Sequence, residues 1–185
     1  VWALGAAVNR RTGTVVRLHT GENISTGQTL SPFEIDIAPG AAIMVRREVF
    51  EQIGFLDEAF YLYYEEADWC LRARQGGYKI LAVPSAIIWH RVSATLGQTS
   101  PVIDYYMARN QLRFIAKHWS GVASFRLYSV SVLRTLLSIA AFTLKSHGGQ
   151  RLPHRNARLL ALRDAIQGRW GEMGYDVAAV CCLSC

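Results

Sequence analysis

The stretch Tyr61-Leu-Tyr-Tyr-Glu-Glu-Ala-Asp-Trp-Cys-Leu-Arg72 crowds three carboxylates, those of Glu65, Glu66 and Asp68, into one turn directly after a cluster of aromatic residues. Like charges a few ångströms apart disfavour one another's ionised forms, so such a cluster usually persists where a metal, a cation or a substrate proton offsets the repulsion. The alternative is a solvated acidic helix start, where the charges complement the helix dipole. Taken alone, the three acids leave both interpretations open.

Periodicity and breakers define the helices on either side of this stretch. A helix is predicted from about Glu65 to Gln75, because apolar residues recur on one face and Gly76-Gly77 follows. A shorter helix is predicted from Arg46 to Ile53, with Gly54 as its C-terminal stop. Pro101 opens a further predicted helix that runs through Trp119.

Short apolar runs predict strands between these helices. The expected strands are Val1–Asn9, Thr14–His19, Lys79–Val83 and Ala86–Trp89.

The segments around the acidic stretch resemble a known family. Gly40–Phe60 lies upstream, and Gly76–Pro84 followed by Ala86–His90 lies downstream. In this order and spacing they resemble the acceptor half of a family 2, GT-A type glycosyltransferase of the rhamnosyltransferase-like branch. The resemblance implies an α/β fold, of which this chain would form the acceptor-side part. The resemblance runs from about Trp2 to Gly171 and is most specific from Gly40 to His90.

The resemblance implies roles for the acids. The family's acidic pair, commonly Glu-Asp, corresponds to Glu65-Glu66, and its second member is the usual catalytic base. Glu66 is therefore the candidate base, but a glutamate reaches further than an aspartate, so the choice between Glu65 and Glu66 stays open. Asp68 and Trp69 are expected at the acceptor, with pairing of Asp68 to a nearby arginine as the alternative.

His90 matches the histidine that helps to hold a divalent metal in related sugar transferases. In an inverting transfer, a carboxylate takes the proton of the acceptor hydroxyl and a cation neutralises the leaving diphosphate. Imidazole and oxygen ligands suit Mn²⁺, and oxygen ligands suit Mg²⁺, so either metal fits. The alternative for His90 is a strand-end histidine that is bonded to backbone.

A second family-like segment is Asp104-Tyr-Tyr-Met-Ala-Arg-Asn110. By the resemblance, Arg109 and Asn110 are expected to close the acceptor site or to bind a phosphate of a lipid carrier. The alternative is an arginine that packs between helices and pairs with a carboxylate such as Asp68.

The family's N-terminal nucleotide-binding half carries an Asp-x-Asp metal motif, and this sequence contains no Asp-x-Asp. The chain also starts at Val1, so we expect a fragment of a longer enzyme that is inactive when isolated. The expected parts are an acceptor-side portion of the GT-A domain (residues 1–100), a helical, membrane-associated extension (101–171) and a tail (172–185).

Composition points toward a membrane. The chain is 51% hydrophobic and 18% charged, with a net charge of +6. Leu127–Leu144 is a run of about 18 apolar or hydroxyl-bearing residues, marginal for a membrane span, with Arg134 inside it. We therefore expect a helix in the membrane plane, peripheral at the cytoplasmic, inner face of the plasma membrane, with ordinary packing and a true span as the alternatives.

The stretch from Lys145 to Arg169 is basic, with Asp164 as its one acid, and is expected to contact anionic lipid or phosphate. It lacks the patterns of nucleic-acid binding, so no nucleic-acid partner is expected. Cys181, Cys182 and Cys185 lack the paired spacing of a zinc site, and an unstructured end is the simpler interpretation.

Together these features predict an inverting, metal-dependent glycosyltransferase of cell-wall or polysaccharide biosynthesis. Its donor is expected to be a nucleotide sugar of rhamnose or another hexose, and its acceptor a glycolipid or polysaccharide. Two other classes stay open, namely a non-catalytic membrane-associated fragment and a metal-dependent hydrolase that uses the same acids with His90.

Overall fold

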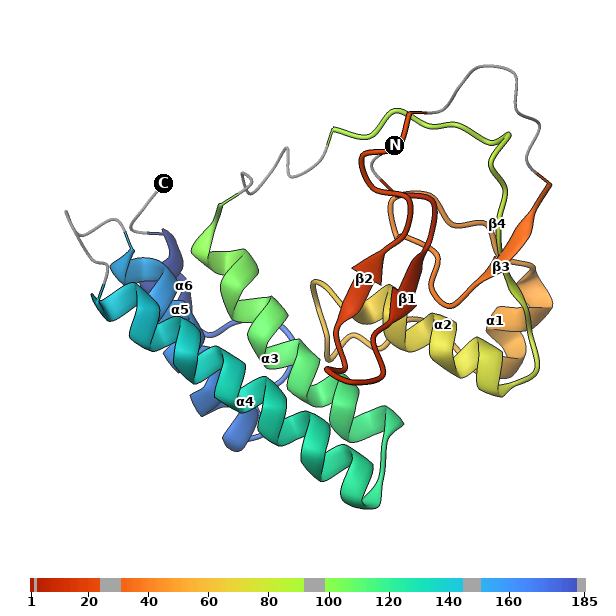
Figure 1. Cartoon of the computed structure of the whole chain (residues 1–185). Coiled ribbons are helices and arrows are strands. Elements are labelled where there is room, and N and C mark those ends of the chain that lie inside the picture. The colour runs from red at the N-terminus through yellow and green to blue at the C-terminus, as the bar shows by residue number, and fades with distance from the viewer. Residues whose placement is uncertain (2, 24–30, 92–98, 145–150, 183–185) are drawn as a thin grey trace. The chain divides into compact units, whose positions relative to one another are not determined.

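The structure is a computed structural model that describes residues 1, 3–23, 31–91, 99–144 and 151–182 (Figure 1). The described residues form two compact units. The first contains Val1–Arg10, Thr14–Asp57 and Glu65–His90, and the second contains Arg11–Gly13, Glu58–Tyr64 and Arg91–Cys185. The chain is therefore mixed α/β, with its strands in the first unit and its long helices in the second.

Two antiparallel strand pairs make up the β structure of the first unit. Strand β1 (Ala6–Val8) pairs with β2 (Val15–Arg17), and β3 (Phe33–Ile35) pairs with β4 (Ile80–Ala82). A single bridge between Ala6 and Ile37 continues from the first pair.

The first predicted strand is shorter than expected because Gly5 has a φ of 94° and interrupts the extended chain. A side chain at Gly5 would meet Ile35 at 2.8 Å, so the glycine also permits this close approach.

The helices of the first unit lie close to their predicted positions. Helix α1 spans Arg47–Ile53, and Gly54, with a φ of 81°, ends it. Helix α2 spans Glu65–Gln75 and stops at the glycine pair Gly76-Gly77.

The expected strand over Ala86–Trp89 is wrong, because this segment has no strand structure. The amide of Ala86 instead bonds the carbonyl of Val83 in a turn, and Ile87, Ile88 and Trp89 are exposed. A strand needs a partner for its backbone groups, and the described residues pair no strand with this segment.

The second unit is a packed set of helices: α3 (Pro101–His118), α4 (Gly121–Leu144), α5 (Leu152–Ile166) and α6 (Tyr175–Cys182). Ser100 caps α3 by accepting a hydrogen bond from the amide of Val102, and Pro101 occupies the first turn. Helices α4 and α5 both pack on α3, and the three run side by side in Figure 1.

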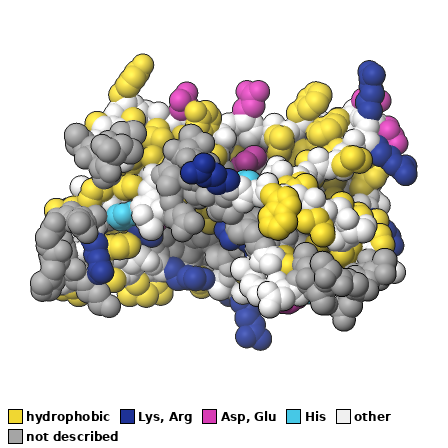
Figure 2. Space-filling view, turned by 90° about the horizontal axis from the view of Figure 1, so that it is seen from above, with side chains coloured by type: hydrophobic (Ala, Val, Ile, Leu, Met, Phe, Trp, Pro, Cys, Tyr) yellow, Lys and Arg dark blue, Asp and Glu magenta, His cyan; other side chains and the backbone are white. Residues whose placement is uncertain are grey.

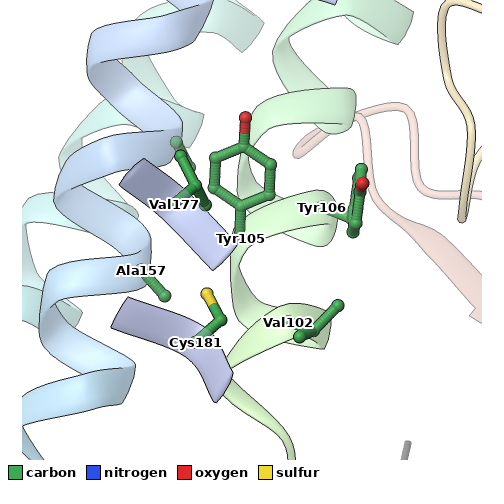
Figure 3. Packing of buried hydrophobic residues seen from close by; sticks show 7 residues of the cluster. Val102, Tyr105, Tyr106, Ala157, Val177 and Cys181 are labelled. Atoms are coloured by element: carbon green, nitrogen blue, oxygen red, sulfur yellow. The ribbon is translucent and has the colours of Figure 1, made fainter. Parts of the chain in front are cut away.

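Residues 172–185, expected as a tail, contain helix α6, which belongs to the core of this unit. Val177 and Cys181 are fully buried against Tyr105 and Tyr106 of α3 and Ala157 of α5, as Figure 3 shows. The sequence did not predict helix α6, because a short helix depends for its stability on tertiary packing rather than on its own hydrophobic pattern. The side chain of Cys182, and all of Cys185, lie outside the described residues.

The basic stretch is largely engaged inside the unit. Arg158 makes two hydrogen bonds with Asp104 of α3, at 2.9 and 2.8 Å, and Arg163 pairs with Asp164 and Asp176. Lys145 lies outside the described residues. Arg169 also lies 3.9 Å from Asp164. The expectation that this stretch as a whole contacts anionic groups is therefore weakened, because these arginines are already paired with acids of the protein.

Candidate functional site

The acidic pair begins α2, directly after a turn with unusual backbone geometry. Tyr61, Tyr63 and Tyr64 have φ values of 62°, 65° and 74°, in the left-handed region that residues with side chains rarely adopt. Such strain persists where surrounding contacts hold it, and it concentrates at functional sites. Here the turn leads straight into Glu65.

Asn110 holds this turn. Its side-chain amide lies 2.7, 2.8 and 2.9 Å from the carbonyl oxygens of Phe60, Leu62 and Tyr63. The amide carries two hydrogens, so one of them is shared between two carbonyls. Asn110 is fully buried, and this role was missed from the sequence because it depends on a contact about 50 residues away in the chain.

The side chain of Arg109 likewise hydrogen-bonds other residues of the protein. Its guanidinium donates to the carbonyl of Gly171 at 2.6 Å, to the hydroxyl of Tyr105 at 3.0 Å and to the side-chain oxygen of Asn110 at 3.0 Å. Arg109 and Asn110 thus bind the backbone of their own unit. An acceptor contact by either residue stays a prediction, and the packing alternative has the direct geometric support, with partners other than Asp68.

The carboxylates of Glu65 and Glu66 are largely withdrawn from water. One oxygen of each, Oε2, is buried and has no hydrogen-bond partner among the described residues. A buried carboxylate oxygen without a donor is costly, so it marks a position where a proton or a ligand can bind.

Gly40 lies against Glu66. A Cβ placed at Gly40 would be 3.7 Å from Cβ and Cγ of Glu66 and 3.8 Å from its Cδ, so the glycine leaves room beside this carboxylate. The backbone of Gly40 also hydrogen-bonds the carboxylate. The family-like segment that begins at Gly40 therefore lies beside the acidic motif in space.

Burial changes the acidity of both groups. Burial, and then the charge of Glu66, raise the pKa of Glu65 to about 7. Burial also raises the pKa of Glu66, while hydrogen bonds with the backbone of Glu66, Ala67 and Gly40 oppose the rise. The pair therefore titrates closer to neutral pH than ordinary glutamates, which suits proton transfer.

Asp68 lies two residues after Glu66 in the same helix, but its carboxylate has a side-chain partner. It is fully buried, and its carboxylate accepts a hydrogen bond from Nε of Arg72 at 2.9 Å. The other guanidinium nitrogens of Arg72 donate to the carbonyls of Ile53 and Phe55, each at 2.7 Å. Pairing with a nearby arginine, the alternative predicted for Asp68, is thus present in the structure.

Trp69 is also part of this internal arrangement. Its side chain is buried, its Nε1 donates to the carbonyl of Gly54 at 2.8 Å, and its ring packs on Phe50 of α1. Together with Arg72 it fixes the connection after α1. Acceptor contacts by Asp68 and Trp69 stay predictions, and both side chains have structural roles here.

His90 is exposed at the end of the first unit. No group of three or more histidine, cysteine or acidic residues that could hold a metal ion occurs within the described ranges. His90 offers one imidazole donor, so the described residues do not fit a complete metal site, and any further ligands would lie elsewhere.

Cys70 faces the interior rather than a ligand. Its sulfur accepts a hydrogen bond from the amide of Ala38 at 3.4 Å, and burial raises the pKa of its thiol to about 11. It therefore acts as a buried helix residue, as its position on the predicted helix indicates.

Comparison with known proteins gives several sugar transferases. The chain is 29% identical over 163 residues to dTDP-rhamnosyl transferase RfbF of Shigella flexneri, which covers 83% of this chain and 52% of that protein. It is 32% identical over 78 residues to galactofuranosyltransferase GlfT2 of Mycobacterium tuberculosis (strain ATCC 25618 / H37Rv), covering 42% and 12% of the two chains.

A shorter match, 34% identical over 59 residues, is to the N-acetylglucosaminyl-diphospho-decaprenol L-rhamnosyltransferase of Mycobacterium tuberculosis (strain CDC 1551 / Oshkosh), covering 32% of this chain and 19% of that protein. No family model matches the chain, and no solved structure matches it. The chain spans about half the length of RfbF and less of the other two. These relatives confirm the resemblance carried by the motifs, because the chain is similar to parts of several glycosyltransferases, two of which are named as rhamnosyl transferases.

Proposed function

We propose that the chain forms the acceptor-side part of an inverting, family 2 glycosyltransferase with a GT-A fold. The donor is a nucleotide sugar of rhamnose or another hexose, and the acceptor is a glycolipid or polysaccharide hydroxyl. The names of the relatives support the reaction class. In this chain, the mechanism is supported by the buried oxygens Oε2 of Glu65 and Glu66 at the start of α2, which have no hydrogen-bond partner in the described part of the structure.

In the proposed reaction, the acceptor oxygen forms a bond to the anomeric carbon of the donor while the bond from that carbon to the diphosphate oxygen breaks. The proton of the acceptor hydroxyl passes to a carboxylate, and the nucleoside diphosphate leaves with the bonding electrons. A carboxylate with a buried oxygen that has no partner among the described residues suits this transfer. Its raised pKa also helps, because a general base works best when its pKa lies near the operating pH.

Glu66 is the proposed base, and Glu65 is the alternative. Backbone hydrogen bonds, including one from Gly40, favour the ionised form of Glu66 and partly oppose the rise in its pKa caused by burial, while its Oε2 has no partner among the described residues. Glu65, with its pKa raised to about 7, holds a proton for part of the time at neutral pH. A protonated Glu65 lowers the repulsion on Glu66, so the two roles complement each other.

A divalent metal, Mn²⁺ or Mg²⁺, would neutralise the leaving diphosphate in such an enzyme. Within this chain, His90 is the one residue proposed as a ligand, and the described residues supply no complete site. The metal-dependent hydrolase considered from the sequence would use Glu65, Glu66, Asp68 and His90, and the carboxylate of Asp68 is paired with Arg72. No observation favours that second function.

The test compares Glu66→Gln with Glu65→Gln in the natural full-length protein. Glutamine keeps the size of the side chain and removes its basicity, so Glu66→Gln should lower turnover by about 10² to 10⁴-fold while donor binding is retained. Glu51→Gln is the matched control, because Glu51 is exposed and pairs with Arg47. If Glu66→Gln turns over normally and Glu65→Gln does not, the base is Glu65, and normal turnover in both variants would refute the proposal.

A further inference from the structure

The outward side of α4 is mainly apolar. Six large hydrophobic side chains of this helix are between 47% and 85% exposed. They are Val122, Phe125, Leu133, Leu136, Leu137 and Leu144, here called the α4 apolar face. Figure 2 shows one face of the molecule, on which hydrophobic side chains and charged ones are both exposed.

The α4 apolar face lies on one side of the helix and is interrupted between Phe125 and Leu133 by the exposed side chains of Arg126 and Ser129. At 3.6 residues per turn, its members fall within an arc of about 120° around the helix. Leu127 and Ser131, the buried residues of α4, lie on the opposite side. Soluble helices turn their apolar stripe toward the core, so an apolar stripe on the outside needs a partner outside the unit.

The charge of α4 indicates which partner fits. The helix contains no acidic residue, and its charged residues, Arg126 and Arg134, are exposed. Long basic side chains can bury their apolar stems and extend their charged ends to anionic headgroups. A protein partner with an apolar groove would gain nothing from this exclusively basic pattern unless it were acidic itself.

Three hydroxyl groups of α4 are also suited to an apolar medium. Thr135, Ser138 and Thr143 each donate to the backbone carbonyl four residues earlier, at 2.9 Å. Their donors are therefore satisfied within the helix and do not require water.

Contacts on the inner side of α4 indicate whether this helix lies in the plane of a membrane or crosses it. Among the described residues, α4 is the one helix long and apolar enough to cross a bilayer by length and composition. However, the guanidinium of Arg158 lies 4.6 Å from the ring centre of Phe142, and Arg158 is paired with Asp104. A spanning α4 would carry these charged groups into the hydrocarbon, which is costly.

We propose that α4 lies in the plane of an anionic membrane, with the α4 apolar face inserted among the acyl chains and Arg126 and Arg134 at the headgroups. Helices α3 and α5 cover the other side of α4 and stay outside the hydrocarbon. This surface would hold the chain beside lipid-linked molecules. The inference does not depend on the glycosyltransferase chemistry.

Flotation of the 185-residue chain with phospholipid vesicles tests the proposal. The chain should float with vesicles that contain an anionic lipid, less with zwitterionic vesicles, and less at high salt. The double variant Leu133→Ser/Leu137→Ser should reduce the partition coefficient on the order of tenfold or more, since two large apolar groups no longer enter the hydrocarbon. Ile166→Ser, at an 81% exposed site on α5, is the matched control and should float as the parent does.

A second variant separates insertion from misfolding. Leu137→Trp keeps the face apolar, and its added fluorescence should be quenched by lipids brominated in the acyl chains, relative to the parent chain. Equal flotation of parent and Leu133→Ser/Leu137→Ser, or an added tryptophan that brominated lipids do not quench, would overturn the proposal. Failure to bind vesicles, together with a dimer that the serine variant dissociates, would also overturn it and assign the face to a second copy of the chain.

Discussion

Helix α2 contains two kinds of buried carboxylate within its first turn. Glu65 and Glu66 each have one buried oxygen with no partner among the described residues, whereas Asp68 is paired with Arg72. The sequence presents all three as one acidic cluster. The structure divides them, because a buried carboxylate with a partner stabilises a fold, whereas one without a partner is available for chemistry.

The largest expected effect on folding is at the paired acid. Asp68→Asn removes the charge that compensates Arg72, whose side chain is 20% exposed, so the free energy of unfolding should fall by about 2–4 kcal/mol. Urea denaturation of the chain measures this loss. A variant as stable as the parent would show that Asp68 is not the structural member of the cluster.

Replacing Glu65 should change the free energy of unfolding in the opposite direction, because its Oε2 has no partner among the described residues. The pKa of Glu65 is raised in the folded state to about 7, from an ordinary value of 4.5, so the folded chain binds more protons than the unfolded chain between these pH values. Stability contributed by this group is therefore present at low pH and is lost as pH rises through that window.

Glu65→Gln removes this penalty, so at pH 8 the variant should be more stable than the parent by about 1–3 kcal/mol, allowing for partial exposure of the side chain. Below pH 4 the two should be equally stable. Denaturation across the pH range measures the difference, and a parent curve that the substitution leaves unchanged would contradict the raised pKa.

The smallest expected effect on folding is at His90. Because the residue is exposed, His90→Ala should change the free energy of unfolding by no more than about 0.5 kcal/mol. In the natural full-length protein, the same change should raise the Mn²⁺ concentration needed for half-maximal activity, and Mn²⁺ binding followed by electron paramagnetic resonance should weaken in parallel. An unaltered metal requirement would leave His90 with a structural role.

The sequence predicted the ends of helices α1 and α2 and the start of α3, because strong local signals mark them. Gly54 and the pair Gly76-Gly77 mark the ends of α1 and α2, and the start of α3 follows from Pro101. The pairing of Asp68 with Arg72 was foreseeable in kind, because residues four apart share a helix face.

The rest depends on contacts between distant segments, which a single sequence does not display. The hydrogen bonds from Asn110 to the turn that precedes Glu65 join residues about 50 positions apart. The burial of Val177 and Cys181 depends in the same way on helices far along the chain. The strand expected at Ala86–Trp89 failed for a related reason, since an apolar run forms a strand only where another strand offers its backbone.

The pH dependence of sugar transfer tests the central claim most directly. In the natural full-length protein, kcat/KM should fall on the acid side as the pair with raised pKa values takes up protons, with an apparent midpoint above that of an ordinary glutamate. In Glu66→Gln this acid limb should be lost and the rate should stay low at every pH. An acid limb and a rate in Glu66→Gln that match the parent would contradict the claim that the unpaired carboxylates of α2 accept the proton of the acceptor.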